Sequence, residues 1–224
     1  MAQRRLVIGN KKYSSWSLRP WLVLRMAEIP FDEVVVPLYV PTTKAAILRH
    51  SPAGRVPILE DGDRLVFDSL AIAEHAAELA PQARLWPADP RARAQARSIS
   101  AEMHAGFGAL RSAMPMNLAC AGRRLATAPS AEVQADVERL AAILEDARER
   151  FGAGGPFLFG GFTIADAMFA PIATRFRTYS IPLPKRAQAW SDAVLALPPF
   201  LEWERAGRAE SYVHAPYEAL LAPA

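Results

Sequence analysis

Apolar positions in the first part of the chain alternate between short continuous runs and residues spaced three or four apart. Short apolar runs bounded by turn residues predict buried strands, and the wider spacing predicts one face of a helix. The predicted strands are Arg4–Ile8, Glu33–Pro37, Val56–Glu60 and Arg64–Phe67. The predicted helices are Ser17–Glu28, Thr42–Arg49 and Asp68–Leu79.

The last two predicted strands are joined by Asp61, Gly62 and Asp63, which is typical of a tight hairpin because glycine accepts a positive φ. The predicted order is therefore strand, helix, strand, short helix, two strands and a helix. This order favours a parallel pair with a crossover helix, followed by an antiparallel hairpin. We expect an α/β domain with a mixed sheet and helices on both of its faces.

Residues 81–90 contain three prolines and no sustained period, which is typical of a linker. Beyond them, two long series of apolar residues at helical spacing predict amphipathic helices that face a common core. The first series is Ile99, Met103, Phe107, Leu110 and Met114, and the second runs from Val133 to Phe151. Further helices are predicted at Thr163–Tyr179 with a kink or break at Pro171, at Lys185–Leu197, and around Phe200–Gly207. We predict an α/β domain over 1–80, a linker over 81–90 and an all-helical domain over 91–224.

The composition is that of a folded protein with a sizeable core, since 51% of the 224 residues are hydrophobic and 22% are charged. A net charge of +3 without a block of like charges gives little support for a nucleic-acid partner. No apolar run reaches the roughly 18 residues of a membrane helix, and no signal peptide is visible, so we expect a cytoplasmic location. One cysteine, Cys120, excludes an intramolecular disulfide, and four scattered histidines show no zinc-like spacing.

Serines gather where the first predicted strand ends and the first helix begins. The sequence from Tyr13 to Pro20 predicts a hydroxyl-rich loop and a helix start, with Pro20 in the first turn, where its missing amide is tolerated. Free amides at a helix start favour an anion, and a thiolate beside Ser14 or Ser15 would be such an anion. The alternative is that both serines only cap the helix, and this stretch alone favours that alternative.

Two further stretches admit a structural and a functional interpretation. If the Val56–Pro57 bond is cis, the backbone of Val56 could point outward and pair with a peptide-like ligand; otherwise Pro57 only begins a strand. Asp68 and Ser69 lie at a predicted helix start, where capping is the default role. In the alternative, Ser69 and its amide hold a ligand carboxylate while Asp68 faces an ammonium group, which would recognise an amino-acid head group.

These three stretches, in this order and spacing, resemble the glutathione transferase superfamily. A fourth match lies at residues 162–166, where Thr163 and Asp166 resemble the capping box of that superfamily's second domain and Phe162 resembles its hydrophobic staple. The resemblance covers nearly the whole chain and is greatest to the zeta-like serine-type enzymes. It implies a thioredoxin-like N-terminal domain followed by an all-helical C-terminal domain.

The resemblance also implies how glutathione, as a co-substrate, would be held. Pro57 would be the cis proline of the thioredoxin-like domain. The backbone of Val56 would pair with the cysteinyl part of glutathione, and Asp68 and Ser69 would hold its γ-glutamyl end.

The glutathione sulfur would accept a hydrogen bond from Ser14, with Ser15 as the neighbouring candidate, and this bond would lower the thiol pKa. Arg55 and Lys44 are candidates for contact with the glycyl carboxylate. The acceptor pocket is expected between the two domains. Its candidate lining residues are Trp16, His104, Phe107 and Arg111. A position on the helix surface suits His104 equally well.

The sequence departs from the zeta-like pattern at two points. Trp16 stands where those enzymes have a cysteine, and Pro20 and Trp21 follow Arg19 where their motif continues with valine and arginine. These differences weigh against the cis–trans isomerase activity of the zeta class. We therefore predict a homodimeric glutathione S-transferase acting in detoxification, which joins the glutathione thiolate to a small, electrophilic, largely apolar substrate. The alternatives are a glutathione-dependent isomerase of the maleylacetoacetate or maleylpyruvate type, a glutathione-dependent peroxidase or reductase, and a non-catalytic ligand-binding protein.

Overall fold

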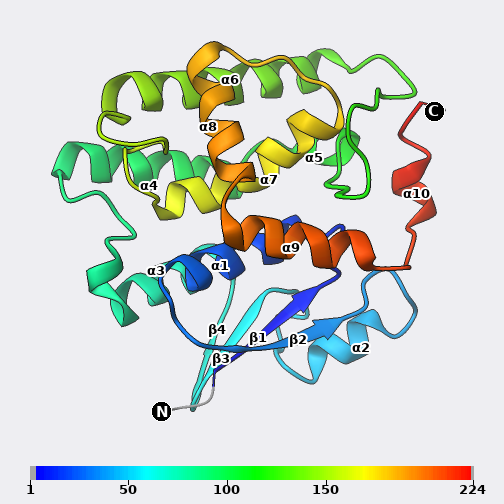
Figure 1. Cartoon of the computed structure of the whole chain (residues 1–224). Helices are drawn as coiled ribbons and strands as arrows, with labels where there is room; N and C mark the ends of the chain where they lie inside the picture. Colours follow the sequence, from blue (N-terminus) through cyan, green and yellow to red (C-terminus); the bar gives the residue numbers. More distant parts are fainter. Residues whose placement is uncertain (1–3, 223–224) are drawn as a thin grey trace.

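A four-stranded mixed sheet forms the N-terminal part of the computed structural model, which describes residues 4–222 (Figure 1). Its strands are β1 (Arg4–Gly9), β2 (Asp32–Val36), β3 (Ile58–Asp61) and β4 (Arg64–Val66), in the spatial order β2-β1-β3-β4. β1 runs parallel to β2 and antiparallel to β3, and β3 and β4 form an antiparallel hairpin. The mixed sheet predicted from the sequence is therefore confirmed.

Alternate residues of β1 pack on opposite faces of the sheet, as the strand period requires. Leu6 and Ile8 belong to the large core, which also contains residues of α1 (Ser15–Met26) and α3 (Ser69–Leu79). Val7 belongs to a smaller cluster with Ile47 of α2 (Thr43–Leu48). Figure 1 shows α1 and α3 between the sheet and the helical part of the chain. This arrangement brings the N-terminal ends of both helices close to the second domain.

The rest of the described chain is helical. Its elements are a 3-10 turn η1 (Pro81–Ala83) and helices α4 (Pro90–Ala105), α5 (Gly108–Ala113), α6 (Ala131–Phe151), α7 (Ile164–Thr178), α8 (Lys185–Leu195), α9 (Pro198–Ala209) and α10 (Ala215–Glu218). Nearly every residue of α7 is buried, and this helix contacts α1, α4 and α8. The core of the second domain is therefore built around α7.

Two predicted features of the helical part differ from the structure. The series from Ile99 to Met114 forms two helices, because the chain leaves α4 at Gly106 and Phe107 takes a left-handed conformation with φ of 62°. Of the kink or break predicted at Pro171, the break is absent, because α7 continues through this residue. The Pro171 carbonyl accepts a hydrogen bond from the Thr174 hydroxyl at 2.8 Å.

The predicted capping box at the start of α7 is confirmed. The Asp166 carboxylate accepts hydrogen bonds from the amide and the hydroxyl of Thr163, each at 2.8 Å. Its other oxygen accepts from the Leu158 amide and the Trp190 indole, each at 2.9 Å. This buried carboxylate therefore fixes the entry to α7 and the packing of α8 on it.

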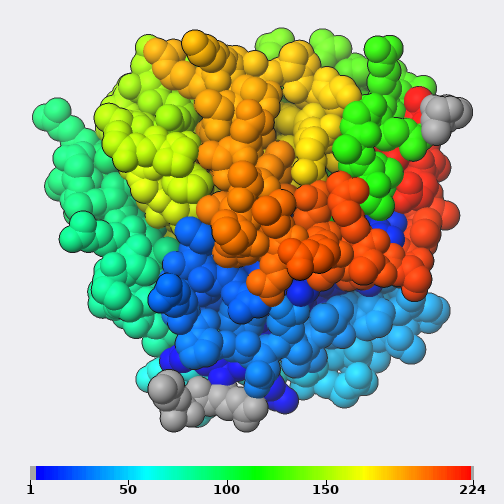
Figure 2. Space-filling view, viewed as in Figure 1, coloured from blue at the N-terminus to red at the C-terminus, as the bar shows by residue number. Residues whose placement is uncertain are grey.

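The two domains are joined by packing between α9 and α1. The Trp203 indole donates to the Lys11 carbonyl at 3.0 Å, and its ring lies 5.2 Å from that of Trp21. Beyond α9, the Glu210 carboxylate accepts from the Lys11 and Lys12 amides at 2.7 and 3.0 Å. In Figure 2 the orange α9 lies directly over the blue N-terminal segment. The loop between β1 and α1 is thus held by the C-terminal part of the chain.

Candidate active site

Two adjoining cavities lie along the boundary between the domains, with volumes of about 550 and 460 Å³. The first cavity is lined by Trp16, Ala53, Arg55, Val56, Pro57, Phe67, Asp68, Ser69 and His104. The second cavity is lined by Tyr13, Ser14, Ser15, Trp16, Leu38, Tyr39, Ile47, Gly54, Arg55, Val56, Arg111, Ser112, Pro115, Met116, Arg175 and Tyr217. Trp16, Arg55 and Val56 line both. A ligand in the first cavity would therefore extend past these residues into the second.

The start of α3 lies at the wall of the first cavity. Asp68 caps this helix, because its Oδ1 accepts a hydrogen bond from the Leu70 amide at 3.0 Å. Ser69, the first residue of α3, is fully buried, and its hydroxyl finds no hydrogen-bond partner among residues 4–222. A buried hydroxyl without a partner is costly, so this one is suited to a polar group of a ligand.

His104, one of the predicted pocket residues, lines the first cavity. Its Nε2 is 2.9 Å from Asp68 Oδ2, and its ring meets the Trp16 ring edge-on at 5.4 Å. Its Nδ1 is buried, and no described residue bonds to it. The last turn of α4 therefore contributes to the same site as the start of α3.

The segment before β3 borders both cavities. The Val56–Pro57 peptide bond is cis, as the family resemblance implies. Arg55 and Val56 line the two cavities, whereas Lys44 is oriented toward the Gly54 carbonyl, with Nζ 3.4 Å from its oxygen. Val56, predicted to pair with the cysteinyl part, and Arg55, predicted for the glycyl carboxylate, therefore both lie where the two cavities meet, and Lys44 is among the lining residues of neither cavity.

The two serines at the start of α1 differ in what they contact. The Ser14 hydroxyl donates to Ser17 Oγ at 2.7 Å, and Ser17 Oγ also accepts from the Gly9 amide at 3.1 Å. The Ser15 hydroxyl instead accepts from Nη2 of Arg175 at 3.2 Å. A hydroxyl has one proton to donate and two lone pairs. Ser15 therefore retains its proton for a ligand, while Ser14 uses its proton inside the loop.

The remaining predicted pocket residues are separated by the structure. The Arg111 guanidinium lines the second cavity and lies 4.6 Å from the Trp16 ring centre, and that of Arg19 lies 4.0 Å from the same ring. Phe107 packs in the large core with 7% of its surface exposed and is not among the lining residues of either cavity. The break between α4 and α5 turns Phe107 away from the direction that a continuous helix would give it.

The second cavity contains aromatic residues that sequence reasoning missed. The hydroxyls of Tyr39 and Tyr217 are 2.8 Å apart, and the rings of Tyr13 and Tyr217 are 5.6 Å apart. The Tyr13 hydroxyl donates to Glu218 at 3.1 Å and accepts from the His214 amide at 3.2 Å. Burial raises the pKa of Tyr13 to about 12, so its phenol stays neutral. Tyr13 adjoins the serines in sequence, but nothing in the sequence connects Tyr217 or Arg175 with them.

Some kinds of site find no support in the structure. Over residues 4–222, no group of three or more histidine, cysteine, aspartate or glutamate side chains is placed to hold a metal ion. None of the described helices combines the length and the apolar character needed to span a membrane.

Comparison with known families identifies the fold and both domains. The model of the glutathione S-transferase N-terminal domain matches residues 13–79, and that of the glutathione S-transferase C-terminal domain matches residues 130–206. The chain belongs to the glutathione S-transferase superfamily. The first match includes the serine loop, the cis proline and the start of α3, and the second includes the capping box of α7.

Individual relatives are distant. A probable maleylacetoacetate isomerase of Caenorhabditis elegans is 30% identical over 107 residues, which is 48% of this chain and 50% of that protein. The chain thus spans about half the length of this curated relative. A glutathione transferase homologue from Burkholderia gl BGR1, solved with bound glutathione, has a TM-score of 0.68 at 24% identity, covering 93% of this chain and 100% of its own. The Tau class glutathione S-transferase of mango, Mangifera indica, has a TM-score of 0.70 at 18% identity. The match covers 92% of this chain and 96% of the mango chain.

Proposed function

We propose that the chain is a glutathione S-transferase, with glutathione in the first cavity and its sulfur at the entrance to the second. Family membership and a structural neighbour with bound glutathione support the choice of co-substrate. The observation that carries the proposal is the Ser69 hydroxyl, which is buried without a partner at a helix start in the first cavity. A carboxylate is the group that such a hydroxyl and the partial positive charge of the helix start favour.

The remaining contacts follow from this placement. Asp68 would face the ammonium group of the γ-glutamyl end, since its side chain is 55% exposed even with His104 beside it. The backbone of Val56 would pair with the cysteinyl part. Arg55 and Lys44 would supply the positive charge for the glycyl carboxylate.

Bound glutathione would supply the nucleophile, a thiolate that attacks the electrophile and displaces its leaving group or adds to its double bond. The chain's part is to hold that sulfur ionised and in place. Ser15 is the better donor of the two serines, because its proton is free and it is the first residue of α1. The partial positive charge of the helix start acts in the same direction. Both effects favour the charged form and therefore lower the thiol pKa.

The second cavity would receive the electrophile between the aromatic rings of Trp16, Tyr39 and Tyr217. Arg111 and Ser112 add polar groups to its wall. The protein offers no thiol of its own there. Cys120 is partly buried, and burial followed by the charge of Glu218 raises its pKa. This favours a transferase over a reductase that uses a protein thiol.

The test is an ultraviolet titration of the thiolate in the wild-type protein mixed with glutathione, alongside calorimetric binding. We expect binding, with the pKa of the bound thiol at least about one unit below the 8.5 of a free thiol. S-methylglutathione, which has no thiol, should bind without any titration signal. If calorimetry with millimolar glutathione detects no association, the proposed function is wrong.

A glutathione-dependent isomerase is the second candidate, favoured by the similarity to the probable maleylacetoacetate isomerase. Reversible addition of the thiolate to a double bond would use the same serine. Conversion of a maleyl substrate that requires glutathione and leaves no conjugate would select the isomerase.

The finer properties of the protein remain part of this proposal. We infer a cytoplasmic homodimer that acts on electrophiles in detoxification, with domains at 1–80 and 91–224 joined by residues 81–90. The exposed side chains of Leu65, on the edge strand β4, and of Phe67, just after it at the wall of the first cavity, support a partner copy that would cover them. Sedimentation of the wild-type protein and of a Leu65→Lys variant would test the dimer.

A further inference from the structure

Arg175 belongs to α7 in the second domain, yet its guanidinium reaches the start of α1 in the first. Nη2 donates to Ser15 Oγ at 3.2 Å, Nε to the Met114 carbonyl at 2.7 Å and Nη1 to the Pro171 carbonyl at 3.3 Å. Only 3% of the Arg175 surface is exposed, and the residue lines the second cavity. All three acceptors are uncharged. The guanidinium therefore brings a positive charge to the cavity that these contacts do not balance.

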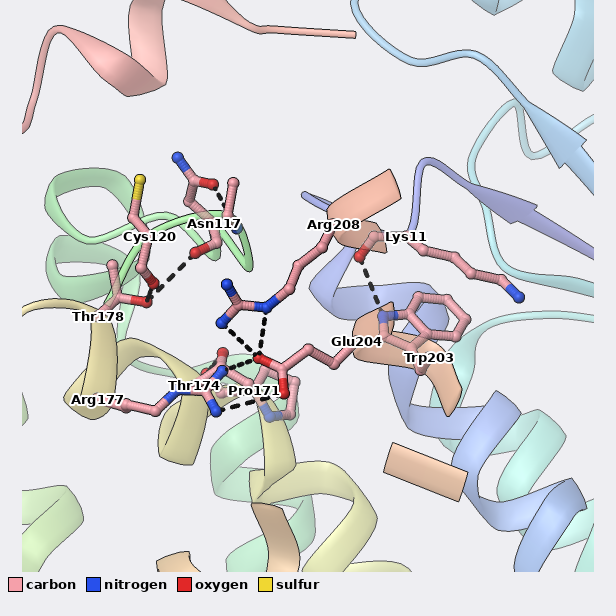
Figure 3. A network of polar contacts seen from close by, with 11 residues as sticks. Lys11, Asn117, Cys120, Pro171, Thr174, Arg177, Thr178, Trp203, Glu204 and Arg208 are labelled. Carbon is pink, nitrogen blue, oxygen red and sulfur yellow. Dashed lines mark hydrogen bonds and ion pairs between the residues drawn. The ribbon is translucent and has the colours of Figure 1, made fainter. Parts of the chain in front are cut away.

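Arg177, two residues further along α7, has an acidic partner within the protein. Its guanidinium pairs with the Glu204 carboxylate of α9, which also accepts from Arg208 at 3.0 Å (Figure 3). Removing an ion from water is costly unless an opposite charge lies beside it. On the cavity side of α7, no aspartate or glutamate is among the described lining residues of the second cavity. The negative charge that would balance Arg175 must therefore come from a ligand bound in the second cavity.

Arg175 stays charged over the pH range in which a thiol ionises. Burial, and then the positive charge of Arg111, lower the pKa of Arg175 to about 10. A free thiol has a pKa near 8.5, and a thiol stabilised by a nearby charge has a lower one. The guanidinium is thus a fixed positive charge while the sulfur loses its proton.

Through its hydrogen bond to Ser15, this positive charge can affect a sulfur atom that is bonded to the same hydroxyl. A hydroxyl that accepts a hydrogen bond from a cation donates its own proton more strongly, because the two bonds polarise each other. The guanidinium also occupies one lone pair of Ser15 and so favours orientations in which the hydroxyl proton points elsewhere. Both effects make Ser15 a better donor to an anion.

We propose that the glutathione thiolate is the counter-ion of Arg175, and that Arg175 is a positioning residue that acts on this sulfur through Ser15. The proposal rests on the proposed function. In the step concerned, the S–H bond of glutathione breaks, its electron pair stays on sulfur and the proton leaves to solvent. Arg175 and Ser15 keep their protons, and no bond to the protein forms.

The test compares Arg175→Gln and Arg175→Lys with Arg177→Gln, a matched control on the same helix that does not line the cavity. The readout is the pKa of bound glutathione from its ultraviolet thiolate absorbance. Arg175→Gln should raise this pKa by about one to two units, the usual effect of removing an adjacent opposite charge, and lower kcat about tenfold at neutral pH. Arg175→Lys should restore most of the shift, and Arg177→Gln should leave the pKa at the wild-type value.

A double variant tests the route through Ser15. If Arg175 acts through this hydroxyl, Ser15→Ala with Arg175→Gln should raise the thiol pKa by less than the sum of the two single changes. Circular dichroism establishes that each variant is folded. Arg175→Met provides a second uncharged side chain should the Gln variant fail to fold.

Three outcomes would overturn the proposal. One is a folded Arg175→Gln or Arg175→Met protein that binds glutathione with the wild-type thiol pKa. Another is an equal pKa shift in Arg177→Gln. The third is an unchanged pKa with a raised KM for 4-chloro-3-nitrobenzoate but not for the neutral 4-chloro-3-nitrobenzamide, which would make Arg175 an anchor for an anionic electrophile. In all three the wild-type protein still binds glutathione, so the proposed function would stand.

Discussion

The starts of α3 and α7 carry the same kinds of residue but differ in how completely their side chains are bonded. At α7, the Asp166 carboxylate accepts four hydrogen bonds, from two donors of Thr163, the Leu158 amide and the Trp190 indole. At α3, Asp68 caps the helix with one oxygen, but the Ser69 hydroxyl has no partner in the described chain. The start of α7 is therefore closed by the protein's own hydrogen bonds, and the start of α3 is open to a cavity.

This difference indicates when a capping motif at a helix start is also a candidate binding site. A hydroxyl or carboxylate at a helix start is by default a cap. It becomes a candidate ligand contact when a buried polar atom remains without a partner and faces a cavity. The start of α1 contains both cases side by side, since Ser14 is bonded within its loop and Ser15 keeps a free proton.

Replacing Asp166 by Ala should destabilise the protein by about 3–5 kcal/mol. The change leaves the buried Leu158 amide and Trp190 indole without acceptors, and each buried unsatisfied donor costs about 1–3 kcal/mol. Urea unfolding measures this loss. The matched change at α3, Asp68→Ala, should cost only about 1 kcal/mol, the usual value of a helix cap. Equal losses at the two starts would contradict the distinction.

Replacing Ser15 by Ala should raise the pKa of bound glutathione by about one unit, which is about 1.4 kcal/mol of thiolate stabilisation. Turnover at neutral pH should fall about tenfold, and the free energy of unfolding should fall by about 1–3 kcal/mol, because the change leaves the buried Nη2 of Arg175 without its acceptor. Ser14→Ala is the control, because its hydroxyl bonds to Ser17 and not to the cavity. A larger rise in thiol pKa for Ser14→Ala than for Ser15→Ala would reverse the assigned roles.

The sequence predicted most of the fold, because local patterns determine most of it. The hairpin glycine and the two apolar periods are enough to predict the mixed sheet, and the structure agrees within one or two residues for most elements. Phe107 was placed in the pocket because a helical series was continued through it. The chain leaves the helix there with φ of 62°, a conformation that the spacing of apolar residues does not reveal.

The candidate site was predictable only in part, for a related reason. Ser14, Ser15, Val56 and Ser69 lie in motifs that each occupy a few consecutive residues. Arg175 lies 160 residues from the serine that it contacts, and the contact depends on how α7 packs against α1. Long-range packing of this kind cannot be derived from spacing along the chain.

Replacing Ser69 by Ala should weaken glutathione binding about fivefold to tenfold, corresponding to about 1–1.4 kcal/mol, the net value of one hydrogen bond. The free energy of unfolding should stay the same or rise slightly, because the change removes a buried hydroxyl that has no partner. Calorimetry and urea unfolding on the same preparations measure both quantities. Unchanged affinity would show that the Ser69 hydroxyl does not contact the tripeptide. A large loss of stability would show that it has a structural partner.

The pH dependence of the free energy of unfolding should also distinguish the start of α7 from the start of α3. Burial raises the pKa of Asp166 above its ordinary value of 3.8, although the four hydrogen bonds that it accepts oppose this. The folded chain therefore holds this proton at higher pH than the unfolded chain does. The resulting stabilisation is complete below pH 3.8 and is lost as the pH rises through the raised pKa.

Asp166→Asn has no proton to lose at this position, so its free energy of unfolding should lack this contribution. As the pH rises from 3.8 through the raised pKa of Asp166, wild-type stability should fall relative to that of the Asn variant. Ser69→Ala removes no titratable group and should follow the wild-type curve. Urea unfolding over a pH series provides the measurement. If wild-type stability instead increased relative to Asp166→Asn over this range, the hydrogen bonds at the start of α7 would outweigh burial, and Asp166 would be a charged cap.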